Sequence, residues 1–233
     1  SLADFPTPVA NVITLADETA YLITGTVDIS PNRIVVGVKN TIAGTDRQND
    51  ILMSDTTGVM FTMDNSVTPK VTLVFDNLTL KATAGTLISA TGGTADQVTF
   101  ISTTITATPN GGTFSGVVFS MRTSSLTSFS TNGFVFSGTN PALTFRDSSA
   151  TNNVGTVFDC TSATFSVVRI SRNSITASSG NTFLNATGTT ITTAANIALN
   201  ILSGTSTHLV GVDENTASWV FTANQGITNT SIA

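Results

Sequence analysis

Short runs of alternating apolar and polar residues return along this chain on either side of a polar bend. The clearest example is VTLVFDNLTL at positions 71–80, in which the bend falls at Asp76 and Asn77. Alternation with a period of two is typical of strands that bury one face, so this stretch predicts two short strands joined by a bend. Related stretches lie at 98–107, 126–136, 165–177, 196–204 and 219–227. The pattern therefore predicts a repeated strand–bend–strand unit, and no stretch predicts an amphipathic helix.

The repeat has a nearly constant period. Aligning one apolar residue after each bend gives spacings of 27, 29, 41, 26 and 26 residues for the column Leu78, Ile105, Phe134, Ile175, Ile201 and Ile227. The spacing of 41 requires one more turn, which LTFRDSSAT at 143–151 supplies. Six steps then give about 25 residues each, a period typical of stacked supersecondary units. The six aligned residues are expected to form one interior column.

A second apolar motif recurs with the same period. It is found at 85–92, 116–123, 155–162, 181–188 and 208–214. Each repeat then contains three strands. Three strands in about 25 residues predict an all-β fold, a single-stranded right-handed parallel β-helix. Residues 1–58 are expected to form an N-terminal arm and the first irregular rungs or cap, and 59–233 the regular β-helix, as one continuous domain.

Strand alternation in the second motif also predicts an outward apolar stripe. The residues between the inward positions are Phe61, Leu87, Val118, Val157, Phe183 and Leu209. Large exposed apolar patches usually mark interfaces, so this stripe predicts lateral association, most simply as a homotrimer. The alternative is that an N-terminal segment or a longer loop folds back over the stripe.

Asparagine falls at or near most of the bends, at Asn77, Asn132, Asn173, Asn200 and Asn224. Stacked asparagine amides can hydrogen-bond to one another along a ladder, which is one explanation of this pattern. The other explanation is that asparagine is simply frequent in turns.

Composition and charge narrow the function classes. Charged residues make up 10% of the chain, the formal net charge is −5, and no lysine follows Lys81, so a basic nucleic-acid footprint is absent. No apolar run is long enough to span a membrane, and no insertion is expected. The single cysteine, Cys160, is expected to be an inert core thiol. The sequence contains no nucleotide-binding motif, so no cofactor is expected.

The chain resembles a known superfamily. The bend repeat, VITLADETAYLITGTVDIS at 12–30 and RIVVGVKNTIAGTDRQNDIL at 33–52 resemble the pectin-lyase-like β-helix superfamily. They are similar to the start of β-helical proteins of bacteriophage virions, including tail spikes and fibres. The resemblance implies a structural virion protein, a tail fibre, appendage or capsid decoration protein, located on the particle surface. Its implied partners are other virion proteins and a host-surface glycan. Two alternatives stay open, a carbohydrate-binding or carbohydrate-cleaving tail spike and a secreted bacterial surface adhesin.

Enzymes of that superfamily use paired carboxylates, or Ca²⁺-binding carboxylates beside an arginine or lysine base. The adjacent Asp-Asp signature of the family is missing here. Asp147 and Asp159 are the one carboxylate pair that could meet, with Arg169 close in the repeat and Arg146 and Arg172 beside it. The competing interpretation is a surface ion-pair cluster. We expect a protein without catalytic activity.

Two weaker candidates for chemistry remain. An early group, Asp46, Arg47, Asp50, Asp55 and Asp64, could bind Ca²⁺, but it lacks regular spacing and favours a solvated loop. His208 is a lone histidine with no cysteine, aspartate or glutamate beside it, so it is a poor metal or catalytic candidate. No metal site is expected.

Overall fold

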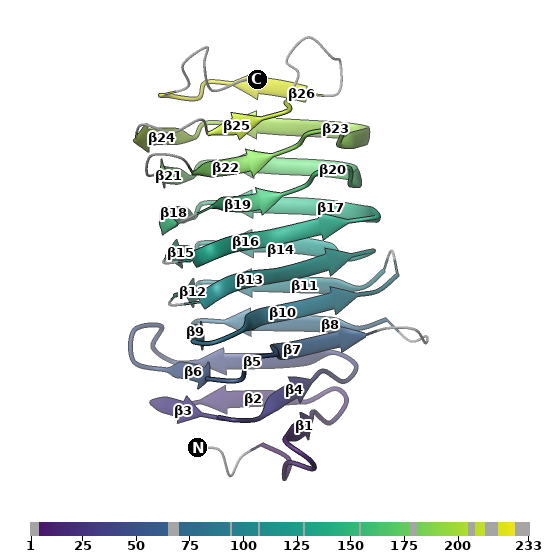
Figure 1. Cartoon of the computed structure of the whole chain (residues 1–233), viewed down its shortest axis with the longest axis vertical. Helices are drawn as coiled ribbons and strands as arrows, with labels where there is room; N and C mark the ends of the chain where they lie inside the picture. The colour runs from purple at the N-terminus through teal and green to yellow at the C-terminus, as the bar shows by residue number, and fades with distance from the viewer. Residues whose placement is uncertain are drawn as a thin grey trace.

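The computed structural model describes residues 5–64, 70–93, 95–106, 108–127, 129–153, 155–177, 181–204, 208–212 and 219–226. In these residues the chain forms a parallel β-solenoid of three sheets with no helix (Figure 1). None of the described residues therefore forms a helix that could span a membrane.

The strands pass in turn through three sheets, named here A, B and C. Sheet A contains β1 (Val12–Thr14), β4 (Arg33–Val35), β7 (Val59–Asp64), β10 (Thr86–Thr91), β13 (Thr108–Ser115), β16 (Phe129–Ser137), β19 (Thr156–Asp159), β22 (Thr182–Asn185) and β25 (Leu209–Val210). Sheet B contains β2 (Ala20–Ile23), β5 (Asn40–Gly44), β8 (Thr72–Asp76), β11 (Gln97–Ile101), β14 (Val118–Arg122), β17 (Thr139–Arg146), β20 (Thr164–Ser171), β23 (Thr190–Ala198) and β26 (Trp219–Thr222). Sheet C contains β3 (Thr26–Asp28), β6 (Ile51–Ser54), β9 (Thr79–Ala82), β12 (Thr104–Ile105), β15 (Ser125–Thr127), β18 (Ser149–Asn153), β21 (Ser174–Ala177) and β24 (Ile201–Gly204).

The predicted period and strand count are confirmed. Neighbouring strands of each sheet pair in parallel, and Thr139 pairs with Thr164, which pairs with Thr190, so register partners lie 25 and 26 residues apart. The three sheets continue across residue 58, since β4, β5 and β6 pair with β7, β8 and β9. At the N-terminal end Phe5 is buried and stacks on Tyr21, with ring centroids 5.1 Å apart.

The interior is filled largely by phenylalanine. The largest fully buried side chains are Phe61, Phe75, Phe100, Phe114, Phe119, Phe129, Phe134, Phe136, Phe145, Phe158, Phe165 and Phe183. Because rungs stack in register, rings of successive rungs meet, as Phe75 and Phe100 do at 5.1 Å. Such ring pairs add about 0.5–1.5 kcal/mol beyond the area that they bury. The stacked aromatic core therefore holds neighbouring rungs together between Phe61 and Phe183.

The expected interior column is wrong in register. The observed column in sheet C is Leu80, Ile105, Leu126, Ala150, Ile175 and Leu202, which keeps only Ile105 and Ile175 from the prediction. Leu78 precedes Leu80 by two residues, Phe134 lies in sheet A, and Ile227 lies outside the described residues. Ile201 is 55% exposed, while its neighbour Leu202 is buried. The inward position is the second residue after the buried residue of the bend, whereas the sequence alignment took the nearest apolar residue.

The expected outward apolar stripe is also wrong. Phe61, Leu87, Val157, Phe183 and Leu209 are all buried, and Val118 is half-buried at the start of β14 in sheet B. The cause is a corner at which the chain enters sheet A. Two successive residues face the interior there, for example Leu87 with Ile88 and Phe183 with Leu184, so strict alternation fails. Homotrimer formation stays a prediction that has lost this support.

Candidate functional site

The chain passes from sheet B to sheet C through a bend that repeats on seven successive rungs. At each bend one residue other than glycine has a positive φ: Asn77 (53°), Ser102 (48°), Thr123 (49°), Asp147 (53°), Arg172 (56°), Leu199 (57°) and Ala223 (51°). A residue in the left-handed conformation interrupts the in-and-out alternation of side chains that the strands before and after it follow. Consequently the bend residue points outward and the residue after it points into the bend, and the two positions form separate columns along the solenoid.

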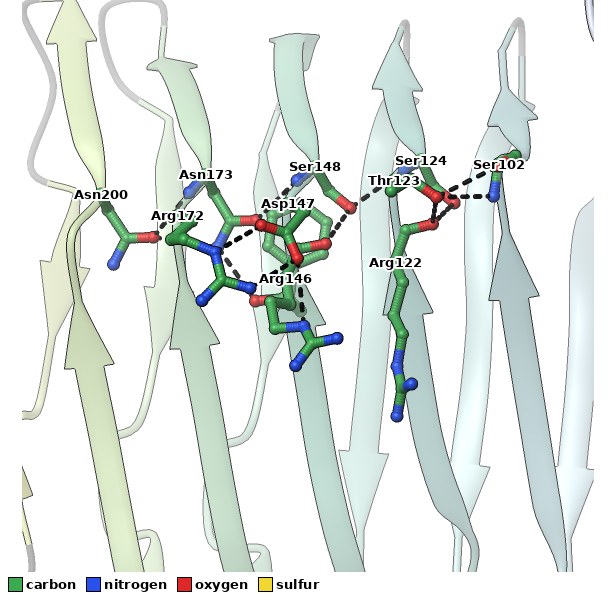
Figure 2. A network of polar contacts seen from close by, with 11 residues as sticks. Ser102, Arg122, Thr123, Ser124, Arg146, Asp147, Ser148, Arg172, Asn173 and Asn200 are labelled. Carbon is green, nitrogen blue, oxygen red and sulfur yellow. Dashed lines mark hydrogen bonds and ion pairs between the residues drawn. The ribbon is translucent and has the colours of Figure 1, made fainter.

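The inner column is a continuous polar ladder of Thr103, Ser124, Ser148, Asn173, Asn200 and Asn224 (Figure 2 shows Ser124, Ser148, Asn173 and Asn200). The backbone N–H of each of the first five residues donates to the side-chain oxygen of the next, over 3.0–3.1 Å. This bond satisfies a buried amide at the point where the sheet ladder is interrupted.

The same side chains also donate. The amides of Asn173, Asn200 and Asn224 donate to the carbonyl oxygens of Phe145, Ile170 and Ile197, and the hydroxyls of Ser124 and Ser148 donate to the carbonyls two residues earlier. Between rungs, the amide of Asn173 donates to Asn200 over 2.9 Å, and that of Asn200 to Asn224 over 2.8 Å. The ladder thus joins the carboxyl ends of sheet B strands across rungs.

Two of the five asparagines predicted for the ladder lie elsewhere. Asn77 is a bend residue of the outer column, one residue before the ladder position, and its amide donates to the carbonyl of Gly44 over 3.3 Å. Asn132 lies in β16 of sheet A, exposed and in register with Asn110. Sequence reasoning missed Thr103, Ser124 and Ser148, although their position directly after the bend could have revealed them.

The outer column carries an ion-pair cluster. Arg172 binds Asp147 on the neighbouring rung with two contacts, Nε to Oδ1 at 2.5 Å and Nη2 to Oδ2 at 2.8 Å, and Nε of Arg146 lies 3.1 Å from Oδ2 of Asp147 (Figure 2). The hydrogen bonds from Arg172 are the main cause that lowers the pKa of Asp147, and the positive charges of Arg172 and Arg146 add to them. Asp147 therefore stays ionised and paired at neutral pH.

The carboxylate pair suggested by the sequence does not form. Asp159 ends β19 in sheet A, where its Oδ1 accepts hydrogen bonds from the backbone N–H and the hydroxyl of Thr161 at 3.1 and 2.6 Å. Asp147 lies at the bend between β17 and β18, so strand β18 and a corner separate the two carboxylates. Arg169 is exposed on β20 of sheet B. The arrangement agrees with the interpretation of an ion-pair cluster around Asp147 alone.

The loop between β5 and β6 holds Asp46 and Asp50 of the early group, while Asp55 follows β6 and Asp64 ends β7. The carboxylate of Asp50 accepts hydrogen bonds from the backbone N–H groups of Gly25, Thr45 and Asp46 and from the hydroxyl of Thr45, over 2.6–3.0 Å. These donors lower the pKa of Asp50 to about 2. Asp46 accepts from Gln48 and Asn49 in the same way. In the described part of the chain no three histidine, cysteine or acidic residues gather as a metal site would require.

Arg47 from this loop lies against the bend column. Its Nη1 donates to the carbonyl of Thr123 over 3.0 Å. Open polar grooves of about 610 and 560 Å³ lie on the bend, and Arg47 and Thr123 line both of them. The second groove also includes Asp147 and Arg172, with Ser125, Ser149 and Ser174 from neighbouring strands of sheet C. This face offers hydroxyls, guanidinium groups and a carboxylate to a polar ligand.

Cys160 and His208 do not belong to this face. Cys160 is buried, and desolvation raises the pKa of its thiol, so it is unreactive as expected. His208 is buried at the corner before β25, with its Nε2 3.0 Å from the carbonyl oxygen of Ser203.

Comparisons with protein-family models, with curated proteins and with solved structures found no match.

Proposed function

We propose that the chain is a non-catalytic structural protein of a bacteriophage virion, a tail fibre, another appendage or a capsid decoration protein, at the particle surface. The polar ladder is the observation that supports this role most directly. In this ladder the polar side chains that follow six bends, from Thr103 to Asn224, form hydrogen bonds that connect the backbone of each rung to the next. A stacked aromatic core and parallel pairing in all three sheets add to a stiff rod.

The placement of the carboxylates supports a role without catalysis. Hydrolysis of a glycoside uses two carboxyl groups that face the scissile bond at a set distance. Asp147 is held by Arg172, Asp50 by four donors of its own loop region, and Asp159 lies around the corner from both. Each of these groups has a structural partner in the described residues.

A second candidate function is binding of a host-surface glycan, as in a tail spike. The polar grooves beside Arg47 favour it, because hydroxyl and guanidinium groups suit the hydroxyls of a sugar. Other virion proteins, and further copies of the chain in a trimer, are the partners that the structural role implies.

Two experiments test the proposal. Immunogold labelling with antibodies against the folded chain is expected to mark phage particles, and labelling confined to bacterial cell surfaces would contradict the virion role. Incubation with host-surface polysaccharide is expected to yield neither new reducing ends nor unsaturated products. If such products form, and disappear in the double variant Asp147→Asn, Asp159→Asn with an unchanged circular dichroism spectrum, the protein is an enzyme.

A further inference from the structure

The positive charge in the second half of the chain is concentrated on one surface. After Lys81 the sequence has four cations, Arg122, Arg146, Arg169 and Arg172. All four lie on β14, β17 and β20, which are consecutive strands of sheet B, or on the bend that follows β20. We call these four residues the arginine patch. Its location is notable in a chain whose net charge is −5.

The patch places like charges next to each other. Arg122 and Arg146 are direct register partners on adjacent strands. Arg146 pairs with Ser171 on the next strand. Arg169 lies two residues before Ser171, so it is a diagonal neighbour of Arg146 on the same face. Like charges that face each other across strands destabilise a sheet. In the described residues Asp147 is the one carboxylate that pairs with the patch, and it contacts Arg146 and Arg172.

One hydroxyl at this surface, that of Ser120, also lacks a partner in the described residues. Ser120 points to the outer face of β14, since Phe119 and Met121 on either side are in the core. It is 4% exposed, yet its Oγ makes no hydrogen bond in the described residues, whereas the Nε of Arg146 has Oδ2 of Asp147 as an ion-pair partner at 3.1 Å. Figure 2 shows the side chains of Arg122 and Arg146 extending from the bend in the same direction, back over sheet B. An unpartnered buried hydroxyl is costly, which favours a ligand that supplies its hydrogen bond.

The side chains around the arginine patch indicate which class of anionic ligand it suits. Thr144 and Asn196, the register partners of Arg169, offer a hydroxyl and an amide. Trp219, Tyr21 and the largest phenylalanines are buried, so the described residues of this face offer no aromatic ring on which a nucleotide base could stack. The large hydrophobic residues that are exposed, such as Leu22, Leu199 and Val220, do not lie on β14, β17 or β20, the strands that carry Arg122, Arg146 and Arg169.

We propose that the arginine patch binds an anionic polysaccharide, one that carries carboxylate or sulfate groups. Guanidinium groups bind such anions through paired hydrogen bonds, and the surrounding hydroxyl and amide groups suit sugar hydroxyls. The arginines occupy successive strands about 4.8 Å apart, so an extended chain lying along the solenoid axis meets several of them. The inference deepens the proposed contact with the host surface by naming its ligand class. Failure of binding leaves the structural role standing, because that role is tested by location on the particle.

Binding to immobilised protein at low salt tests the inference with four probes. These are hyaluronan oligosaccharides for carboxylate, heparin for sulfate, dextran as a neutral polysaccharide and oligothymidylate as a polyanion with bases. At least one acidic saccharide is expected to bind and to weaken as salt is added, while dextran does not bind and oligothymidylate binds more weakly. If neither acidic saccharide binds, if dextran binds equally well, or if oligothymidylate binds most tightly, the proposal is overturned.

Variants locate the site. The triple variant Arg122→Gln, Arg146→Gln, Arg169→Gln is expected to bind about tenfold more weakly or worse, since it loses charged hydrogen bonds. Arg172 is kept because it holds Asp147. The matched control Arg33→Gln, Lys39→Gln, Lys81→Gln removes the same charge outside the patch and is expected to bind like the wild type. Equal binding by the patch variant, or an equal loss in the control, contradicts the site. If the triple variant fails to fold, the single variants Arg122→Gln and Arg169→Gln at exposed positions replace it, each with a severalfold loss expected.

Discussion

At the scale of single residues, the solenoid depends on polar side chains that act as backbone substitutes. Asn200 is 1% exposed, and its side chain makes four hydrogen bonds. Its Oδ1 accepts from the backbone and the side-chain amide of Asn173, and its amide donates to the carbonyl of Ile170 and to Asn224. A hydroxyl fills the same position in Ser124 and Ser148, because either group places an oxygen where the backbone N–H of the preceding rung points.

Asn200→Ala is therefore expected to lower the free energy of unfolding by about 2–4 kcal/mol. Two N–H groups of Asn173 lose their acceptor, and an unsatisfied buried donor costs about 1–3 kcal/mol. Urea denaturation followed by circular dichroism measures the change. The matched control is Asn196→Ala on the preceding strand, where the exposed asparagine is expected to change stability by no more than about 0.5 kcal/mol. Equal effects of the two substitutions would show that the ladder does not stabilise the fold.

At the scale of elements, the bends and corners differ in how they direct side chains. A bend residue with positive φ separates an outward from an inward polar position. The corner into sheet A instead buries two successive apolar residues, and the loop between β5 and β6 is shaped by a carboxylate. Asp50 accepts hydrogen bonds from Gly25, in the turn between β2 and β3, and from Thr45 and Asp46 at the start of its own loop. Its charge therefore joins this turn to the loop of the next rung.

This loop predicts a specific pH dependence. The ordinary pKa of the Asp50 carboxyl is 3.8 and the folded one is about 2, so the unfolded chain binds the proton more tightly. Stability from Asp50 is then complete above about pH 4 and is lost as the pH falls toward 2. Thermal melts between pH 7 and 2 are expected to show this loss in the wild type. In Asp50→Asn the midpoint is lower at pH 7 and falls less between pH 4 and 2.

Asp55→Asn at an exposed position serves as the control and is expected to follow the wild type across this range. A wild-type midpoint that does not fall below pH 4, or an Asp50→Asn profile parallel to that of the wild type, would contradict the role of the Asp50 charge.

At the scale of the whole molecule, each rung contacts its neighbours and little else. The three sheets pair in chain order, each strand with the strands one turn before and after it (Figure 1). Stability of such a solenoid is approximately a sum of rung terms and interfaces between rungs. The length of the rod can then change by whole turns without a change of fold.

Deletion of residues 139–163 is expected to leave a folded, shorter solenoid. Thr164 is the register partner of Thr139, and its N–H already bonds to the carbonyl of Gly138, so Thr164 can follow Gly138 directly. Deletion of 139–150 removes half a turn and places a segment of sheet C after sheet A, and this variant is expected not to fold. Circular dichroism and the cooperativity of thermal unfolding distinguish the two. If both deletions unfold the chain, the rungs are not interchangeable units.

The sequence by itself determined the class of the fold, because alternation and period are local and repeated. The stretch at 71–80 predicted both strands of the bend, and the spacing of about 25 residues predicted three strands for each turn. The asparagines at 173, 200 and 224 were found in the same way, since each directly follows a bend. Asp147 and Arg169 were identified as charged residues of interest, although not their surroundings.

Tertiary structure decided the register and the surfaces. Which of Ile201 and Leu202 faces inward depends on stacking against Ile175 of the preceding rung, which no local window contains. Leu87 and Phe183 are buried because a corner breaks the alternation on which the predicted stripe rested. The arginine patch likewise exists only through stacking. Arg122 and Arg146 are 24 residues apart in sequence, and the parallel register makes them neighbours.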